Sequence, residues 1–177
     1  MKEVQRERLA VRLKDFILGA QDGIVSSLGL ALGVAFATLN SRIVIISGLA
    51  GALAEFISMT AVAYTSTEAA EHYYKTEKHR KLKMPKEYKS PFESGLIVGL
   101  SNIIGSLVAI VPFFFFGLNE AIKNSVIVSA VVLFLIGVIE AKLTVGNWIK
   151  SGLKLTLIGL VAAFAGYLIG RVLGVLV

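Results

Sequence analysis

Long apolar runs separated by shorter polar segments dominate the chain. Because a helix that crosses a bilayer needs about 20 apolar residues, the runs predict five spans: residues 16–39, 43–66, 94–117, 122–141 and 153–176. The connections are short except for residues 67–93, a polar segment that holds two of the three prolines and is expected to lie in water. The pattern predicts an all-α, polytopic membrane protein in which residues 1–177 form a single domain of five transmembrane helices.

Composition supports this prediction and restricts the chemistry. Hydrophobic residues make up 55% of the 177 positions and charged residues 17%, and the mean hydropathy of +0.76 is far above that of a water-soluble domain. The chain has no cysteine, which excludes disulfides and thiolate metal sites. Any metal site must therefore use carboxylate, imidazole, thioether or carbonyl ligands.

Lysine and arginine residues are distributed unevenly about the predicted spans. Fifteen of the 18 lie in the N-terminal segment, in residues 67–93 and after the fourth span, whereas three lie on the other side: Arg42, Lys123 and Arg171. The positive-inside rule then predicts a cytoplasmic N-terminus, a cytoplasmic segment 67–93 and an outside C-terminus. The basic residues are spread over three segments without interleaved aromatic residues, so we expect no nucleic-acid partner.

Acidic residues within the spans are few: Asp22, Glu55 and Glu140. A charged side chain inside the membrane costs roughly 2.5–3.5 kcal/mol on insertion scales, and such residues usually mark ion or proton pathways. Asp22 is followed by Gly23 and two serines, and we interpret it as functional rather than structural. Glu140 precedes Lys142 at the cytoplasmic end of its span, where an ion pair is the simpler interpretation.

Glu55 and Met59 are four residues apart in the second span, so both project from one face of a helix. A carboxylate beside a thioether favours softer divalent transition ions such as Fe(II) over the abundant hard cations. The alternative for Met59 is packing, because methionine fills irregular gaps between helices.

The end of the second span carries a second acidic group. Glu68, Glu71 and His72 occupy positions i, i+3 and i+4, a spacing that could hold a divalent cation if the helix continues. The alternative is a solvated helix end, because seven basic residues follow in the loop and repel cations.

Glycines recur every four residues in the first, third and fifth spans, at Gly19 and Gly23, Gly29 and Gly33, Gly95 and Gly99, and Gly166, Gly170 and Gly174. Such stripes predict close helix contacts. Five helices make a narrow bundle, and we therefore hypothesise that a polar seam for an ion lies at a dimer interface.

Four segments resemble the vacuolar iron transporter family, in order and spacing. They are "ILGAQDGIVSSLGLALGVA", "GLAGALAEFISMTAVAYTST", "VPFFFF" and "AKLTVGNWIKSGLKLTLIGLVAAFAGYLIGRVLG". The resemblance implies a homodimer of five-helix protomers that moves Fe(II) and Mn(II) out of the cytosol in exchange for protons. It also implies that Asp22 is the intramembrane carboxylate of the translocation path and Met59 its thioether partner, whereas Glu55 falls where some branches have glycine.

The resemblance is incomplete in the loop. Family members of the plant type have a longer, glutamate-rich cytoplasmic domain that binds metal ions, but the segment here is short and rich in lysine. The chain therefore resembles a short prokaryotic-type member of the cell membrane, in which metal loading from the cytosol would fall to Glu68, Glu71 and His72.

The sequence thus predicts a transporter that exports Fe(II) or Mn(II), with metal and protons as partners and no resident cofactor. Desolvation favours the protonated form of a carboxyl group, so a carboxylate in the membrane can exchange a proton for a metal ion. The alternative is a structural membrane protein whose polar residues serve helix association. We do not expect an enzyme, because both histidines lie in the aqueous segment and no catalytic or nucleotide-binding motif is present.

Overall fold

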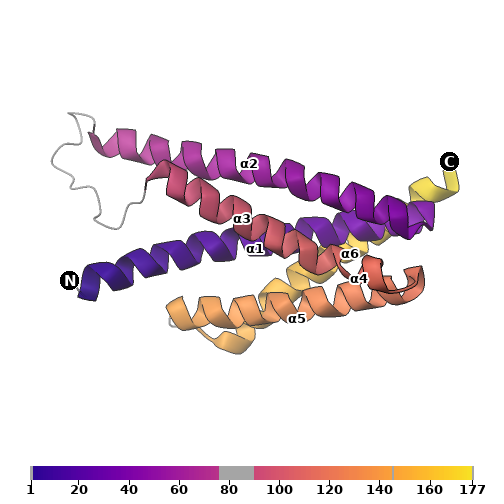
Figure 1. Ribbon diagram of the computed structural model, residues 1–177. Coiled ribbons are helices and arrows are strands. Elements are labelled where there is room, and N and C mark those ends of the chain that lie inside the picture. Colours follow the sequence, from indigo (N-terminus) through magenta and orange to yellow (C-terminus); the bar gives the residue numbers. More distant parts are fainter. Residues whose placement is uncertain (1, 76–89, 145, 177) are drawn as a thin grey trace.

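The computed structural model describes residues 2–75, 90–144 and 146–176. Within these ranges the chain forms helices and no strand. The helices are α1 (Lys2–Thr38), α2 (Ser41–Lys75), α3 (Pro91–Ile110), α4 (Pro112–Phe115), α5 (Leu118–Thr144) and α6 (Trp148–Leu176) (Figure 1). The predicted all-α fold is confirmed.

Five segments are long and apolar enough to cross a membrane: Leu9–Thr38, Ser41–Lys75, Pro91–Phe115, Leu118–Lys142 and Trp148–Gly174. Each corresponds to one predicted span. Of the predicted cytoplasmic segment 67–93, residues 67–75 continue α2, and Ser90 caps α3 by accepting a hydrogen bond from the Glu93 backbone N–H. Residues 76–89 lie outside the described ranges.

The third predicted span, residues 94–117, differs from the structure at its C-terminal end. α3 stops at Ile110, and the four-residue α4 begins at Pro112. Proline has no backbone N–H to donate within a helix and its ring clashes with the preceding turn. The chain bends here, Phe116 N–H closes the short helix on the Pro112 carbonyl, and α4 connects α3 to α5.

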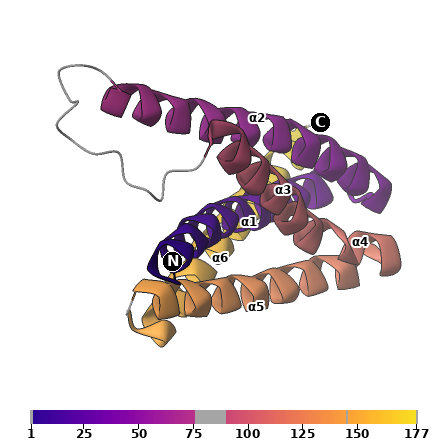
Figure 2. The same cartoon turned by 60° about the vertical axis from the view of Figure 1, so that its left-hand side comes forward.

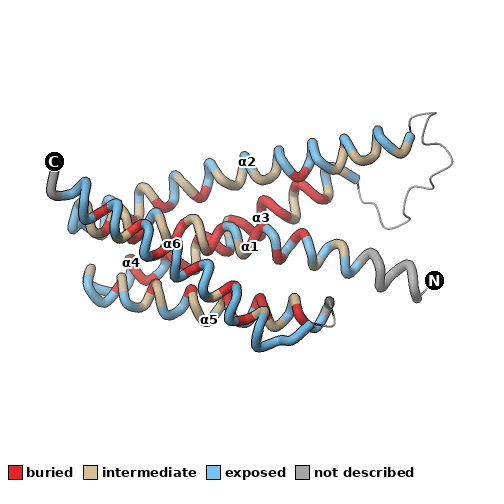
Figure 3. Tube along the Cα trace, turned by 180° about the vertical axis from the view of Figure 1, so that it is seen from behind, coloured by how far each residue is buried: buried red, intermediate tan, exposed pale blue. Residues whose placement is uncertain are grey.

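α1 forms the centre of the bundle and contacts α2, α3, α5 and α6 (Figures 1 and 2). Buried positions are densest on α1 and α3, whereas the outward faces of α2, α5 and α6 are largely exposed (Figure 3). Exposed apolar residues such as Ile46 and Ile57 of α2 suit contact with lipid. α1 begins and α6 ends at opposite ends of the bundle, as an odd number of crossings requires.

The glycine stripes bring α1 against two neighbours, as predicted. A Cβ atom on Gly23 would lie 2.1 Å from the backbone oxygen of Asn102 in α3, and one on Gly166 would lie 2.1 Å from the backbone oxygen of Gly29 in α1. Both distances are far below van der Waals contact, so any larger residue would force the backbones apart. α1 is therefore held between α3 and α6 by backbone contacts.

Candidate metal site between α1, α2 and α3

α1 and α2 run antiparallel and meet along a polar seam in the middle of the bundle. Toward the connection between α1 and α2, Leu30 covers Gly51, whose Cβ position lies 2.8 Å from Leu30 Cδ2. One turn further along each helix, the Ser26 hydroxyl donates to Glu55 Oε2 at 2.8 Å. Asp22 lies on the next turn of α1. We call these five residues the α1–α2 seam.

The two carboxylates of the seam lie at similar depth. Asp22 is near the middle of the span Leu9–Thr38, and Glu55 is near the middle of Ser41–Lys75. Because the two helices are joined by a two-residue connection, residues equally far from that connection lie opposite each other. The sequence-predicted Asp22 and Glu55 are thus brought to one region of the membrane by α1 and α2.

α3 supplies the third wall of the site. The Asn102 side chain donates from Nδ2 to Asp22 Oδ2 at 3.2 Å, and the Ser106 hydroxyl donates to the Gly23 backbone carbonyl at 3.3 Å. Glu55 also interacts with the side chains of Asn102 and Ser106 and with the charge of Asp22. The two carboxylates therefore share polar contacts with α3.

The seam opens on the flank of the helix bundle. Asp22 is exposed and Glu55 is half-buried, although both belong to spans that cross the membrane. From Ser26 an apolar groove of about 590 Å³ continues between α1 and α6 toward Thr38 and Leu173. The open side of the seam and this groove lie on one continuous face of α1, because Asp22, Ser26 and Gly33 are separated by whole turns.

A second, more polar cavity lies toward the opposite end of the seam. It has a volume of about 300 Å³ and is lined by residues of α1, α2 and α3, among them Lys14, Asp15, Met59 and Ser94. Met59, which the sequence placed beside Glu55, lies one helical turn away from it and faces this cavity. The structure therefore places the thioether between the seam and the end of the bundle at which α1 begins.

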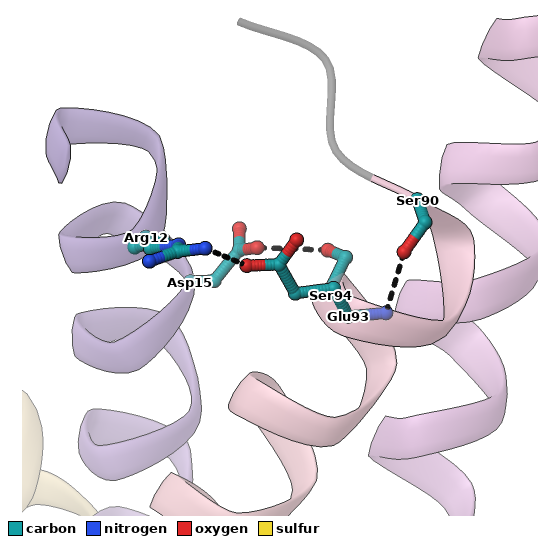
Figure 4. A network of polar contacts seen from close by, with 5 residues as sticks. All are labelled: Arg12, Asp15, Ser90, Glu93 and Ser94. Atoms are coloured by element: carbon teal, nitrogen blue, oxygen red, sulfur yellow. Dashed lines mark hydrogen bonds and ion pairs between the residues drawn. The ribbon is translucent and has the colours of Figure 1, made fainter. Parts of the chain in front are cut away.

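Asp15 is almost fully buried at this cavity. Its exposed fraction is 9%, and its carboxylate accepts a hydrogen bond from the Ser94 hydroxyl at 2.8 Å. Beside it, Arg12 and Glu93 form an ion pair of 2.5 Å between α1 and α3. Figure 4 shows both contacts side by side, with Ser90 capping the start of α3. Together these contacts fasten α1 to α3 at the end of the cavity.

The predicted group at the end of α2 has a different setting. Glu71 forms an ion pair with Lys75 one turn on, and the Tyr64 hydroxyl lies 3.4 Å from Glu68 Oε1. Within residues 2–75, 90–144 and 146–176, no three histidine, cysteine, aspartate or glutamate side chains gather closely enough to hold a metal ion. A role for Glu68, Glu71 and His72 in metal binding stays a prediction.

The amino-acid sequence of the chain has relatives among known proteins. A sequence model described as the VIT family matches residues 13–86 and 78–171. These ranges include α1 from residue 13 onward, the whole of α2, α3, α4 and α5, and most of α6. The chain belongs to the VIT family. Membership of this family and five apolar helices identify an integral membrane protein.

Relatives that match over most of their length include both short and long proteins. An uncharacterized protein of Methanocaldococcus jannaschii is 29% identical, with 88% of this chain and 86% of that protein covered. Vacuolar iron transporter 1 of Tulipa gesneriana is 22% identical over 90% of this chain and 86% of its own length. Vacuolar iron transporter 1 of Oryza sativa subsp. japonica is 25% identical, with 88% and 82% covered.

Two polar residues of this VIT-family chain escaped the sequence analysis. Asn102 lies in an apolar stretch, "GLSNIIGS", where a single amide gives little signal beyond its rarity at membrane depth. Asp15 follows Lys14 at the edge of the first span and resembles a solvated end residue. Only the packing of α1 on α3 reveals that both are buried and hydrogen-bonded.

Proposed function

We propose that this VIT-family protein exports a divalent transition metal, Fe(II) or Mn(II), from the cytosol in exchange for protons. The observation that carries the proposal is the pair of carboxylates, Asp22 and Glu55, that α1 and α2 bring together at mid-membrane. The plant relatives are named vacuolar iron transporters, which supports iron as a substrate.

Two carboxylates match the charge of one divalent cation. In the absence of metal, both negative charges in a medium of low polarity repel each other, and protonation relieves that repulsion. A metal ion that enters the seam displaces the protons, which then leave toward one side of the membrane. When the metal departs, protons from the other side return, so that metal export and proton import use the same carboxylates in turn.

Met59 would add the soft ligand. Its position at the cavity with Asp15 suits a first contact for ions that arrive from the side on which α1 begins. We propose that this side is the cytoplasm, because most lysine and arginine residues flank the spans on this side. We also propose that the membrane is a prokaryotic cell membrane. Glu68, Glu71 and His72, at the same end of α2, would raise the local metal concentration.

We further propose that the functional unit is a homodimer. A carboxylate such as Asp22 that is exposed at mid-membrane is costly against lipid, and the adjoining groove along Gly29 and Gly33 presents an apolar surface of small residues, which favours helix association. A second copy packed against this face of α1 would cover both, and would enclose the seam as a path between protomers.

Uptake into proteoliposomes tests the function. Purified protein is reconstituted, a pH gradient is imposed, and entry of Fe(II), Mn(II), Mg(II) and Ca(II) is measured together with internal pH. The proposal predicts that uptake of Fe(II) or Mn(II) is accompanied by exit of protons, so that the lumen becomes more alkaline; acidification during uptake would contradict the exchange. If correctly assembled protein gives the flux of empty vesicles for every metal, the chain is a structural membrane protein instead.

A further inference from the structure

The Asn102 carboxamide is only half satisfied. Asn102 lies near the middle of α3 with an exposed fraction of 0%. Its Nδ2 donates to Asp22 Oδ2 at 3.2 Å, whereas its Oδ1 is buried and has no hydrogen-bond partner among the described residues. Buried side-chain oxygens in proteins are nearly always hydrogen-bonded, so this oxygen calls for a ligand.

Two buried serines near Asn102 on α3, Ser101 and Ser106, each form a hydrogen bond through their side-chain oxygen. The Ser101 hydroxyl donates to the Val98 carbonyl of its own helix at 2.9 Å, and the Ser106 hydroxyl donates to the Gly23 carbonyl. Both hydroxyls thus bond backbone carbonyls and serve the packing of the helices. Of the three side chains, Asn102 donates to Asp22, and both Asn102 and Ser106 interact with Glu55.

The backbone around Asn102 has no room to shift. The Cβ position of Gly23 is 2.1 Å from the Asn102 backbone oxygen, and that of Gly105 is 2.2 Å from the Ala20 backbone oxygen. α1 and α3 are therefore in direct contact on both sides of the residue. Only the side-chain torsions remain free, and half a turn of the carboxamide exchanges the positions of its nitrogen and oxygen.

Each orientation of the carboxamide suits one state of the seam. With Nδ2 toward Asp22, the amide donates to one oxygen of the metal-free carboxyl group, which accepts this bond whether or not its other oxygen carries a proton. With Oδ1 toward Asp22, two oxygen atoms would face each other and repel, unless a cation lies between them. Carboxamide oxygens are good ligands for Mn(II) and other divalent ions that accept oxygen.

We propose that Asn102 is a metal ligand of the seam, which presents Nδ2 to Asp22 when the site is empty and Oδ1 to the metal when it is loaded. This inference rests on the proposed function and names a further ligand of the same site. Two carboxylates provide the charge that balances a divalent cation, and the carboxamide adds a third ligand without adding charge. The metal-loaded site is then neutral, which suits an ion that must leave again.

Mn(II) binding to the full-length protein in detergent tests the inference. Bound and free Mn(II) are separated by electron paramagnetic resonance, and uptake is measured in proteoliposomes on the same preparations. Asn102→Leu keeps the volume and removes both polar atoms, and we expect its apparent affinity for Mn(II) to fall about tenfold or more. Ser101→Ala, a change at the adjacent buried position, is the matched control and should bind as the wild type does.

Asn102→Asp separates ligation from structure. One carboxylate oxygen can replace Oδ1 on the metal, but the empty site then holds three acidic groups and has lost its donor. We therefore expect Asn102→Asp to retain Mn(II) binding and to gain more thermal stability from added Mn(II) than the wild type gains. A residue that only positions Asp22 would give a folded Asn102→Asp protein with weakened binding and no such gain.

The outcomes distinguish the two proposals. If the wild type neither binds nor transports Mn(II) or Fe(II), the proposed function and this inference both fail. If the wild type transports metal and folded Asn102→Leu binds Mn(II) as tightly, the inference is overturned and the function stands. Should Asn102→Leu not fold, Asn102→Asp decides, since loss of Mn(II) binding by that variant overturns the inference.

Discussion

The Ser26 hydroxyl lies 2.8 Å from Glu55 Oε2 across the α1–α2 seam, and the same oxygen lies 2.8 Å from the Asp22 backbone carbonyl of its own helix. The single proton of Ser26 can therefore satisfy either acceptor. Ser26 thus holds the Glu55 carboxylate level with the helical turn that contains Asp22. If Glu55 moves away, the Ser26 hydroxyl still has the Asp22 carbonyl as an acceptor.

Glu55→Gln tests the second carboxylate of the proposed pair. Glutamine has almost the same shape and can still accept the hydrogen bond of Ser26, so expression and oligomeric state should match the wild type. The loss of one negative charge should raise the metal concentration for half-maximal uptake about 10- to 100-fold. The measurement is Fe(II) and Mn(II) uptake over a range of concentrations, and an unchanged half-maximal concentration would remove Glu55 from the site.

Met59→Leu tests the thioether. Leucine keeps most of the volume at the cavity that Met59 lines and removes the sulfur, so packing is preserved while the soft ligand is lost. We expect the ratio of Fe(II) to Mg(II) uptake to fall, with proton coupling retained. Met59→Ala serves as the comparison for lost volume. If Met59→Leu shows the wild-type ratio and Met59→Ala shows only reduced stability, Met59 is a packing residue.

The end of α2 gives a third prediction. Replacing Glu68, Glu71 and His72 together by alanine should weaken apparent metal affinity and leave maximal transport largely intact, because these residues lie far from the seam along α2. Concentration-dependent uptake separates the two parameters. Since Glu71 pairs with Lys75, Lys75→Ala controls for loss of that ion pair. Equal affinities in the triple variant and the wild type would identify a solvated helix end.

Helix packing gives a fourth prediction. Gly166→Ala places a methyl group 2.1 Å from the Gly29 backbone oxygen, so α1 and α6 must separate, at a cost of about 1–3 kcal/mol in the free energy of unfolding. Gly117→Ala is the matched control, because nothing lies within 4 Å of its Cβ position. Thermal unfolding in detergent compares the two, and equal stability would show that α6 is not seated against α1 as described.

The sequence was sufficient to predict the helices because apolar runs of membrane length are separated by short connections. It did not predict the break between α3 and α4 at Pro112, because the hydropathy stays high across it. Glycine spacing correctly indicated close contacts, but not that Gly23 faces Asn102 and Gly29 faces Gly166. Such pairs depend on how helices distant in sequence cross, and spacing within one helix holds no information about its partner.

The candidate site was predictable only in part, for a related reason. Asp22 and Glu55 are conspicuous because a charge in an apolar run has a high cost. Asn102 and Asp15 became visible only through their contacts with Asp22 and Ser94, which join residues about 80 positions apart. Asn102 is neutral, and Asp15 lies beside a lysine at the edge of a span. Neither residue therefore stands out in the sequence as a charge within an apolar run does.

Asp22→Asn tests the central claim, which is that Asp22 exchanges protons for metal. Asparagine is nearly isosteric and carries no charge, so the variant should express and assemble as the wild type does, without the cost of an ionisable group in the membrane. It cannot bind and release a proton in alternation with a metal ion. A structural aspartate would instead give impaired assembly and flux in proportion to the protein that survives.

The decisive measurement is proton-coupled Fe(II) or Mn(II) flux per correctly assembled protein, with reconstituted protein quantified after size-exclusion chromatography. We predict that Asp22→Asn falls to the level of empty vesicles while its amount and oligomeric state stay at the wild-type values. Near-normal flux per assembled Asp22→Asn protein would contradict the mechanism.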